Sequence, residues 1–207
     1  MTLARTCLLL VLIGGLLGAG LPAPTAAQDL DSTETPLVRT TSPDTTVEPD
    51  VPFVRTPQRL VDQMLEFADV SEDDVVYDLG SGDGRIPITA ALKYGARGVG
   101  IEIKPDLVQK ARLNAEQAGV AGRVEFRQGD LFEADISEAT VVTLYLLPDV
   151  NTRLRPKLFE ELEPGTRVVS HGFDMGEWEA DAAIETQNTF LFLWTIPEEI
   201  PAHLQSE

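Results

Sequence analysis

The residues of this chain that could do chemistry begin with a glycine-rich stretch, DLGSGDGR, whose first residue is Asp78. It places glycine at every second position, at Gly80, Gly82 and Gly84, and glycine permits a sharp turn and the close approach of a ligand. A dinucleotide fingerprint spaces its glycines G-x-G-x-x-G and holds a diphosphate. Here the spacing differs, and the carboxylates of Asp78 and Asp83 would repel a diphosphate. The stretch therefore favours a nucleotide-like cofactor that carries positive charge.

Two more acidic residues follow apolar segments further along the chain. Glu102 lies 22 positions after Gly80 (102 minus 80), which is the approximate spacing at which an acid binds the hydroxyl groups of a ribose. Asp130, in the sequence GDLF, can accept a hydrogen bond from the amino group of an adenine. A ribose, an adenine and a cationic amino-acid tail together describe S-adenosylmethionine, which is the cofactor that we expect.

These residues need a scaffold that brings them to one edge. Short apolar segments alternate with amphipathic ones, which predicts a parallel sheet with helices on both faces. Asp78 and Glu102 each end an apolar segment, and open parallel sheets bind ligands at the carboxyl ends of their strands. The last two segments, AAIET and TFLFLWTI, meet at Gln187 and Asn188 and predict a hairpin. We therefore expect an α/β fold with a doubly wound, mostly parallel seven-stranded Rossmann-like sheet and a terminal antiparallel hairpin.

Composition limits the partners that the chain can have. Its 207 residues and 43% hydrophobic content are sufficient for one domain with a core. The formal net charge of -18 argues against a nucleic-acid partner, because affinity for nucleic acid depends on Lys and Arg side chains that neutralise phosphates. The one cysteine, Cys7, precedes an apolar run, so the chain beyond it has no disulfide and no thiolate metal site. We expect a monomer without a bound metal.

The first residues of the chain are typical of an export signal. Arg5 precedes an apolar run from about Cys7 to Leu21, and small residues follow as far as Ala27, which predicts a secretory signal peptide and a periplasmic or secreted protein. The alternative is an uncleaved membrane anchor, because glycine and alanine lengthen the run toward a bilayer span. The expected organisation is a signal peptide or anchor at 1–27, a disordered linker at 28–51 and a folded domain at 52–207.

The sequence is similar to a known family over about residues 52–197. The stretches VVYDLGSGDGR, GVGIEI and FRQGDLF resemble the first three cofactor motifs of the class I, seven-stranded methyltransferases. The stretches VPFVRTPQRLVDQML, VVTLYLLPDVN and PGTRVVSHGFDMGEW resemble a bacterial branch related to the mitochondrial lysine methyltransferases that act on the ATP synthase c subunit and the adenine nucleotide translocase. The resemblance implies an S-adenosylmethionine-dependent enzyme that methylates a protein lysine, with possible proximity to a membrane.

The resemblance also implies roles for individual residues. Asp78 and the glycine loop would hold the methionine moiety, Glu102 the ribose, and Asp130 with its neighbour the adenine. Tyr145 either belongs to the core or begins an acceptor loop, in which YLLP replaces the Asn/Asp-Pro-Pro-Tyr motif of other amino-group methyltransferases. The residues implied are, for the cofactor, Phe53, Thr56, Asp78, Gly80, Ser81, Gly82, Gly84, Glu102, Ile103, Asp130 and Leu131, and, for catalysis, Tyr145 and Pro148.

Several other residues have both a functional and a structural interpretation. Trp178 can line an acceptor channel or cap the core, where amphipathic rings are common. His171, Asp174 and Glu177 can be drawn as a metal site, but three such residues in a loop are more often hydrogen-bonded or solvated. The basic cluster RLRPK, at 153–157, is expected to be a solvated helix face.

Three functions remain open from the sequence. The first is methyl transfer to a protein lysine, the second is methyl transfer to a small molecule, and the third is binding of the cofactor or a related nucleoside without catalysis. Methyl transfer mainly requires that donor and acceptor be held close and aligned. A lysine must first lose its proton, and a dry, aromatic-lined channel favours this because it lowers the pKa of the amine.

Overall fold

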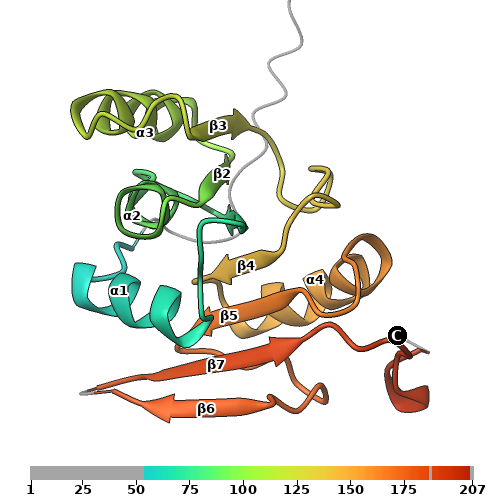
Figure 1. The fold of residues 1–207 in the computed structure, drawn as a ribbon. Coiled ribbons are helices and arrows are strands. Elements are labelled where there is room, and N and C mark those ends of the chain that lie inside the picture. Colours follow the sequence, from blue (N-terminus) through green and yellow to red (C-terminus); the bar gives the residue numbers. More distant parts are fainter. Residues whose placement is uncertain (1–53, 187, 206–207) are drawn as a thin grey trace, which may run out of the picture. The chain divides into compact units, whose positions relative to one another are not determined.

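The computed structural model describes residues 54–186 and 188–205, so the expectations for Phe53, the signal peptide and the linker lie outside the described residues. Within them seven strands form one sheet in the order β3-β2-β1-β4-β5-β7-β6 (Figure 1). The strands are β1 Val75–Leu79, β2 Arg97–Glu102, β3 Val124–Gln128, β4 Val141–Leu144, β5 Arg167–His171, β6 Ala182–Glu185 and β7 Phe190–Thr195. The helices are α1 Gln58–Phe67, α2 Arg85–Tyr94, α3 Pro105–Gln117, α4 Pro148–Glu161 and the short η1 Ala202–Leu204.

The direction of the strands confirms the predicted fold. Strands β1 to β5 pair in parallel, whereas β7 is antiparallel to both β5 and β6. The terminal hairpin thus places a reversed strand inside the sheet, between β5 and β6. This is the seven-stranded, Rossmann-like sheet that the alternating segments predicted.

Helices cover both faces of the sheet, with α1, α2 and α3 on one face and α4 on the other (Figure 1). The alternating side chains of β1 reach both layers, because successive residues of a strand point to opposite faces. Tyr77 and Leu79 belong to the core on the α4 side, and Val76 packs with α1 and α2 on the other side. Burial on both faces explains why this strand reads as a continuous apolar segment. No helix within residues 54–186 and 188–205 is long and apolar enough to cross a membrane.

Parallel pairing brings the carboxyl ends of the strands to one edge. The register sets Asp78 of β1 beside Gly100 of β2 and Thr143 of β4. At the opposite edge, Asp74 precedes β1, where its carboxylate accepts hydrogen bonds from Ser71 and Thr140 and pairs with Arg167. The two edges therefore differ. At the amino edge, Asp74 is paired with other side chains of the protein, whereas the carboxyl edge holds the residues that the sequence predicts to bind the cofactor.

Candidate active site

The glycine loop turns sharply between β1 and α2. Gly80, Gly82 and Gly84 have φ angles of 83°, 53° and 79°, in the left-handed region that favours glycine. The backbone N–H groups of Gly80 and Ser81 both donate to the carbonyl of Ile101, each at 2.9 Å. These bonds fasten the loop to the end of β2, so the predicted tight turn after the first strand is confirmed.

The loop also packs closely on β2 and β3. A Cβ atom on Gly100 would lie 2.6 Å from both the Ser81 Oγ and the Phe126 Cδ1, and a Cβ on Gly84 would lie 2.5 Å from the Phe126 Cζ. The Ser81 hydroxyl is buried with no hydrogen-bond partner among the described residues. Its side chain faces β2 here, and its contact with a cofactor stays a prediction.

Glu102 closes the glycine loop from the end of β2. It is 7% exposed, and its Oε2 accepts a hydrogen bond from the Gly82 N–H at 2.8 Å while its Oε1 accepts one from the Lys104 N–H at 2.9 Å. A carboxylate oxygen has two acceptor positions, so each oxygen retains one. The predicted binding of a ribose hydroxyl is therefore compatible with the bonds that hold Glu102 in place.

Asp78 is the most deeply buried acid of this edge, with 4% of its surface exposed. Its Oδ1 accepts a hydrogen bond from the Thr143 hydroxyl at 2.8 Å. Burial raises the pKa of Asp78; the Thr143 hydrogen bond opposes this, the negative charges of Glu102 and Asp83 add to it, and the result is about 7. A buried carboxylate beside a second acid is costly unless a positive charge meets it. These residues therefore fit a cofactor with a cationic amino-acid tail.

Asp83 has a different role from the one that its sequence position indicated. Its carboxylate accepts hydrogen bonds from the Arg85 Nε and Nη2 at 2.8 and 2.7 Å, and Arg55 lies 3.4 Å away. Burial opposes the ionised form, but the hydrogen bonds and charge of Arg85 hold the pKa of Asp83 below its usual value. Its charge is thus balanced within the protein, whereas the hydrogen bonds to Asp78 and Glu102 come from a hydroxyl and from backbone amides.

The remaining predicted cofactor residues surround the same edge. Asp130 is half-buried after β3, where its Oδ1 accepts the Phe132 N–H at 2.9 Å. Leu131 packs on the core of the α4 side, and Ile103 is half-buried directly after Glu102. Thr56 is buried ahead of α1, and its carbonyl accepts a hydrogen bond from Arg85 at 2.8 Å. The contacts of these residues with adenine or with the rest of the cofactor stay predictions.

An aromatic cluster forms the neighbouring part of the edge. The half-buried ring of Tyr145, just after β4, stacks on the ring of His171, the last residue of β5. Phe173 lies further along, with its ring centroid 6.5 Å from that of Tyr145. Burial lowers the pKa of His171, which favours the neutral form of its imidazole. Pro148 is exposed as the first residue of α4, a position that suits proline whatever the chemistry.

Helix α4 holds the segment that carries Phe173. Asn151 and Arg155 are buried, and they donate hydrogen bonds to the carbonyls of Asp174 at 3.1 Å and of Met175 at 2.9 Å. The expectation of a solvated basic face at 153–157 is therefore wrong at Arg155, which is 2% exposed. Its guanidinium is used inside the protein, because the loop after β5 folds over α4 and needs donors for its carbonyl groups.

Trp178 and His171 both have aromatic partners in the structure. Trp178 packs against Phe159 and Trp194 with ring centroids 4.5 and 5.8 Å away, so it belongs to the core. Within the part of the chain that the structure describes, no group of three or more His, Cys, Asp and Glu side chains could hold a metal ion. His171 thus joins the aromatic cluster, a partnership that the sequence did not reveal because Tyr145 lies 26 positions earlier (171 minus 145).

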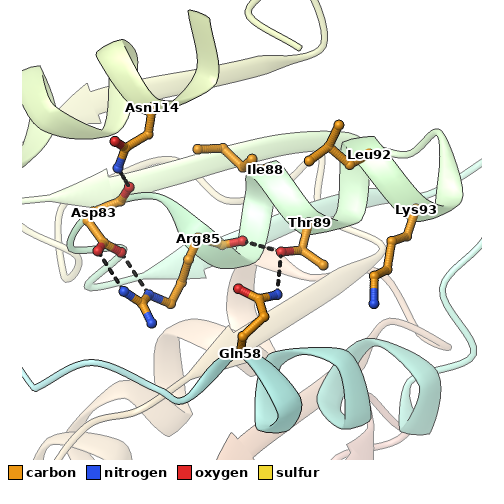
Figure 2. Close-up of a pocket in the computed structure, with 8 residues that line it drawn as sticks. All are labelled: Gln58, Asp83, Arg85, Ile88, Thr89, Leu92, Lys93 and Asn114. Atoms are coloured by element: carbon orange, nitrogen blue, oxygen red, sulfur yellow. Dashed lines mark hydrogen bonds and ion pairs between the residues drawn. The ribbon is translucent and has the colours of Figure 1, made fainter. Parts of the chain in front are cut away.

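A cavity of about 460 Å³ lies behind the glycine loop, between α1, α2 and α3. Figure 2 shows the residues that line it. They are Gln58, Asp83, Arg85, Ile88, Thr89, Leu92, Lys93 and Asn114. Of the residues from Gly80 to Gly84, only Asp83 lines the cavity, so the cavity is separate from the acids at the strand ends.

The known proteins that this chain is similar to are methyltransferases, which agrees with the cofactor that the geometry of the site fits. Residues 78–182 match the model of a family described as the ANTKMT methyltransferase domain. The chain is 50% identical over 155 residues to a protein-lysine N-methyltransferase of Saccharolobus islandicus, which covers 72% of this chain and 96% of the relative. It is 38% identical over 135 residues to the mouse adenine nucleotide translocase lysine N-methyltransferase, which covers 65% of this chain and 58% of that enzyme.

Among solved structures, a protein described as an RNA methyltransferase from Salinibacter ruber, in complex with S-adenosyl-L-homocysteine, has a TM-score of 0.72 and 70% sequence identity. The match covers 73% of this chain and 99% of that protein. The family model extends from the end of β1 to the start of β6, and so includes the glycine loop, the acids Asp78 and Glu102 and the aromatic cluster. The chain therefore belongs to the ANTKMT methyltransferase domain family and is a class I, S-adenosylmethionine-dependent methyltransferase.

Proposed function

We propose that this methyltransferase transfers its methyl group to the amino group of a protein lysine. The aromatic cluster of Tyr145, His171 and Phe173 is the observation that carries the proposal. Its rings replace water around an amine brought against them, and this loss of hydration lowers the pKa of the amine. A neutral lysine amine is the nucleophile that the reaction needs. The names of the archaeal and mouse relatives support the same acceptor.

We propose that the two parts of the carboxyl edge of the sheet have different roles, one in binding the cofactor and the other in binding the acceptor. Bound S-adenosylmethionine supplies a methyl group on a positively charged sulfonium. Asp78 and the glycine loop hold the amino-acid tail, Glu102 holds the ribose, and Asp130 with Leu131 holds the adenine. Tyr145 and Pro148 border the acceptor and align its amine with the methyl group, which is the main requirement of a displacement reaction.

Charge favours a protein acceptor over RNA, although one similar solved structure is described as an RNA methyltransferase. The net charge of -18 repels a phosphate backbone, and RNA affinity depends on basic side chains. The same charge attracts a lysine-rich segment and speeds its encounter with the site. We therefore propose a basic protein segment as the substrate, and RNA becomes an outcome of the test.

The test supplies S-adenosylmethionine with a tritiated methyl group to the purified chain, together with protein extract, total RNA or a metabolite fraction. We expect label that protease releases and nuclease does not, located on lysine by mass spectrometry, and lost in the Tyr145→Leu variant. Label that nuclease releases would assign RNA as the acceptor. Label confined to metabolites would assign a small molecule, and cofactor binding without any transfer would leave a non-catalytic domain.

We further propose that the enzyme belongs to a bacterial branch related to the mitochondrial c-subunit and translocase lysine methyltransferases, and that it works as a monomer near a membrane. The motifs shared with those enzymes and the apolar N-terminal run support this. Residues 1–27 would direct export or anchor the chain, 28–51 would link and 52–207 would form the enzyme. N-terminal sequencing of the protein from separated cell fractions distinguishes cleavage after Ala27 from an intact anchor, and size-exclusion chromatography tests the monomer.

A further inference from the structure

Arg85, the first residue of α2, joins two segments that are far apart in the sequence. Its Nε and Nη2 donate to the carboxylate of Asp83 in the glycine loop, and its Nη1 donates to the carbonyl of Thr56 at 2.8 Å. Figure 2 shows the forked pairing of Arg85 with Asp83. Thr56 belongs to residues 54–57, which precede α1. One guanidinium therefore connects the start of the described chain to the loop that binds the cofactor.

Other contacts reinforce this connection. Arg55 approaches the Asp83 carboxylate from residues 54–57. The Gln58 amide donates to the Thr89 hydroxyl at 3.0 Å, and that hydroxyl donates to the carbonyl of Arg85 at 2.7 Å. This second path joins the first residue of α1 to the first turn of α2, so α1 and α2 are linked beside the same arginine.

The segment at 54–57 depends on these contacts for its position. It contains neither helix nor strand, and Val54 is 58% exposed. Segments with few buried apolar contacts lie at the low-stability end of a fold and open first. Thr56 is nevertheless buried, and Arg85 holds its carbonyl beside the loop. Loss of the guanidinium would let this segment leave the loop.

We propose that Arg85 is a positioning residue for the cofactor, which holds residues 54–57 against the glycine loop and so slows the release of S-adenosylmethionine. Arginine suits this task because its planar fork satisfies a carboxylate with two bonds and leaves a further N–H for a carbonyl. A lysine would keep the charge but offers a single nitrogen. The inference concerns the cofactor alone, and it holds whichever acceptor the enzyme uses.

The experiment compares Arg85→Gln and Arg85→Lys with the matched control Lys93→Gln. Lys93 pairs with Asp62 at 2.8 Å, so it also links α2 to α1, but through the opposite end of α2. Stopped-flow kinetics give the release rate of S-adenosylmethionine, calorimetry gives its Kd, hydrogen exchange of the free protein reports on residues 55–58, and thermal unfolding reports on stability. We expect Arg85→Gln to speed release and raise the Kd about tenfold, since hydrogen bonds to charged groups contribute at this level.

Arg85→Lys should fall between Arg85→Gln and the unmodified chain, and Lys93→Gln should leave the release rate and exchange at 55–58 unchanged. Equal release rates in the Arg85 variants and the unmodified chain would overturn the proposal. Faster release in Lys93→Gln to the same degree would assign the effect to general packing of α1 on α2. Faster release without faster exchange at 55–58 would assign it to the loop alone. If Arg85→Gln does not fold, Arg85→Lys carries the same comparison.

Discussion

The ring of Tyr145 lies face to face with the ring of His171, with centroids 3.9 Å apart and planes inclined by 25°. Tyr145 follows β4 and His171 ends β5, so the contact joins two neighbouring strand ends beside the cofactor residues. The His171 Nδ1 is buried without a hydrogen-bond partner among the described residues. Packing against Tyr145 therefore has a larger share in orienting the imidazole than hydrogen bonding through that nitrogen.

Replacement of His171 should affect the acceptor and spare the cofactor. We expect His171→Leu to lower kcat by up to about tenfold, because stacked rings contribute roughly 0.5–1.5 kcal/mol. His171→Phe keeps the ring and should keep most of the activity. The measurements are kcat, KM for the acceptor and the Kd of S-adenosylmethionine, with Phe190→Leu on the exposed hairpin as the matched aromatic control. A weaker cofactor Kd in His171→Leu would mean that the histidine serves general structure.

Cofactor binding should strengthen as the pH rises through about 7. The raised pKa of Asp78 means that its carboxyl is largely protonated in the free protein below that value. A cationic ligand favours the ionised form, so binding at pH 6 releases a proton and should be about five- to tenfold weaker than at pH 8. Calorimetry in buffers of different ionisation enthalpy measures the proton. A pH dependence that persists in Asp78→Asn would show that another group is responsible.

The raised pKa of Asp78 should also make the stability of the free protein depend on pH, and this contribution to stability should decrease as the pH rises. A raised pKa in the folded state means that folding favours protonated Asp78, so this contribution to stability is complete below 3.8 and is lost as the pH rises to about 7. Asp78→Asn removes that loss, so the free protein should unfold at a higher temperature than the unmodified chain at pH 8. The cofactor should stabilise the variant less. A variant that is less stable at pH 8 would contradict this account of the buried carboxyl.

Close packing of the glycine loop predicts the effect of a single methyl group. Gly100→Ala would place its Cβ 2.6 Å from Ser81 and Phe126, and overpacking of this kind costs about 1–3 kcal/mol. We expect this loss in the free energy of unfolding from urea denaturation, together with weaker cofactor binding, because Ser81 is part of the loop. A Cβ at Gly122 would have no described neighbour within 4 Å, so Gly122→Ala is the control. Equal stability of the two variants would contradict the packing.

Asp74 at the amino edge should matter for stability and not for binding. Burial opposes its ionisation, but hydrogen bonds from Thr140 and Ser71 and the charge of Arg167 lower its pKa overall. A lowered pKa gives stability that is present above 3.8 and is lost as the pH falls through the folded value. Asp74→Asn should therefore destabilise the protein at pH 7 by about 1–3 kcal/mol, and the difference should shrink in acid. A change in cofactor Kd would contradict this separation of the two edges.

The sequence alone determined the fold class and the cofactor, and it predicted which residues bind that cofactor. The alternation of apolar and amphipathic segments predicts the order of strands and helices, because the spacing of the buried side chains differs between a strand and a helix. Asp78, Glu102 and the glycine loop follow or end apolar segments. Open parallel sheets bind ligands at the carboxyl ends of their strands, so the sequence predicts the place of the ligand. The terminal hairpin was also readable, since two short apolar segments flank Gln187 and Asn188.

Only the tertiary structure decided which side chains become partners. Thr143 meets Asp78 through the register of β1 and β4, Tyr145 meets His171 across two strand ends, and Arg85 pairs with Asp83 while holding Thr56. Arg155, which resembles a surface residue in its own sequence context, is buried by the loop after β5. Most of these contacts join residues that are distant along the chain, and the others depend on how deeply a side chain is buried. A local sequence pattern shows neither the distant partner nor the burial. The physical reason is that hydrogen bonding and pKa depend on which groups exclude water around a side chain, and packing alone settles that.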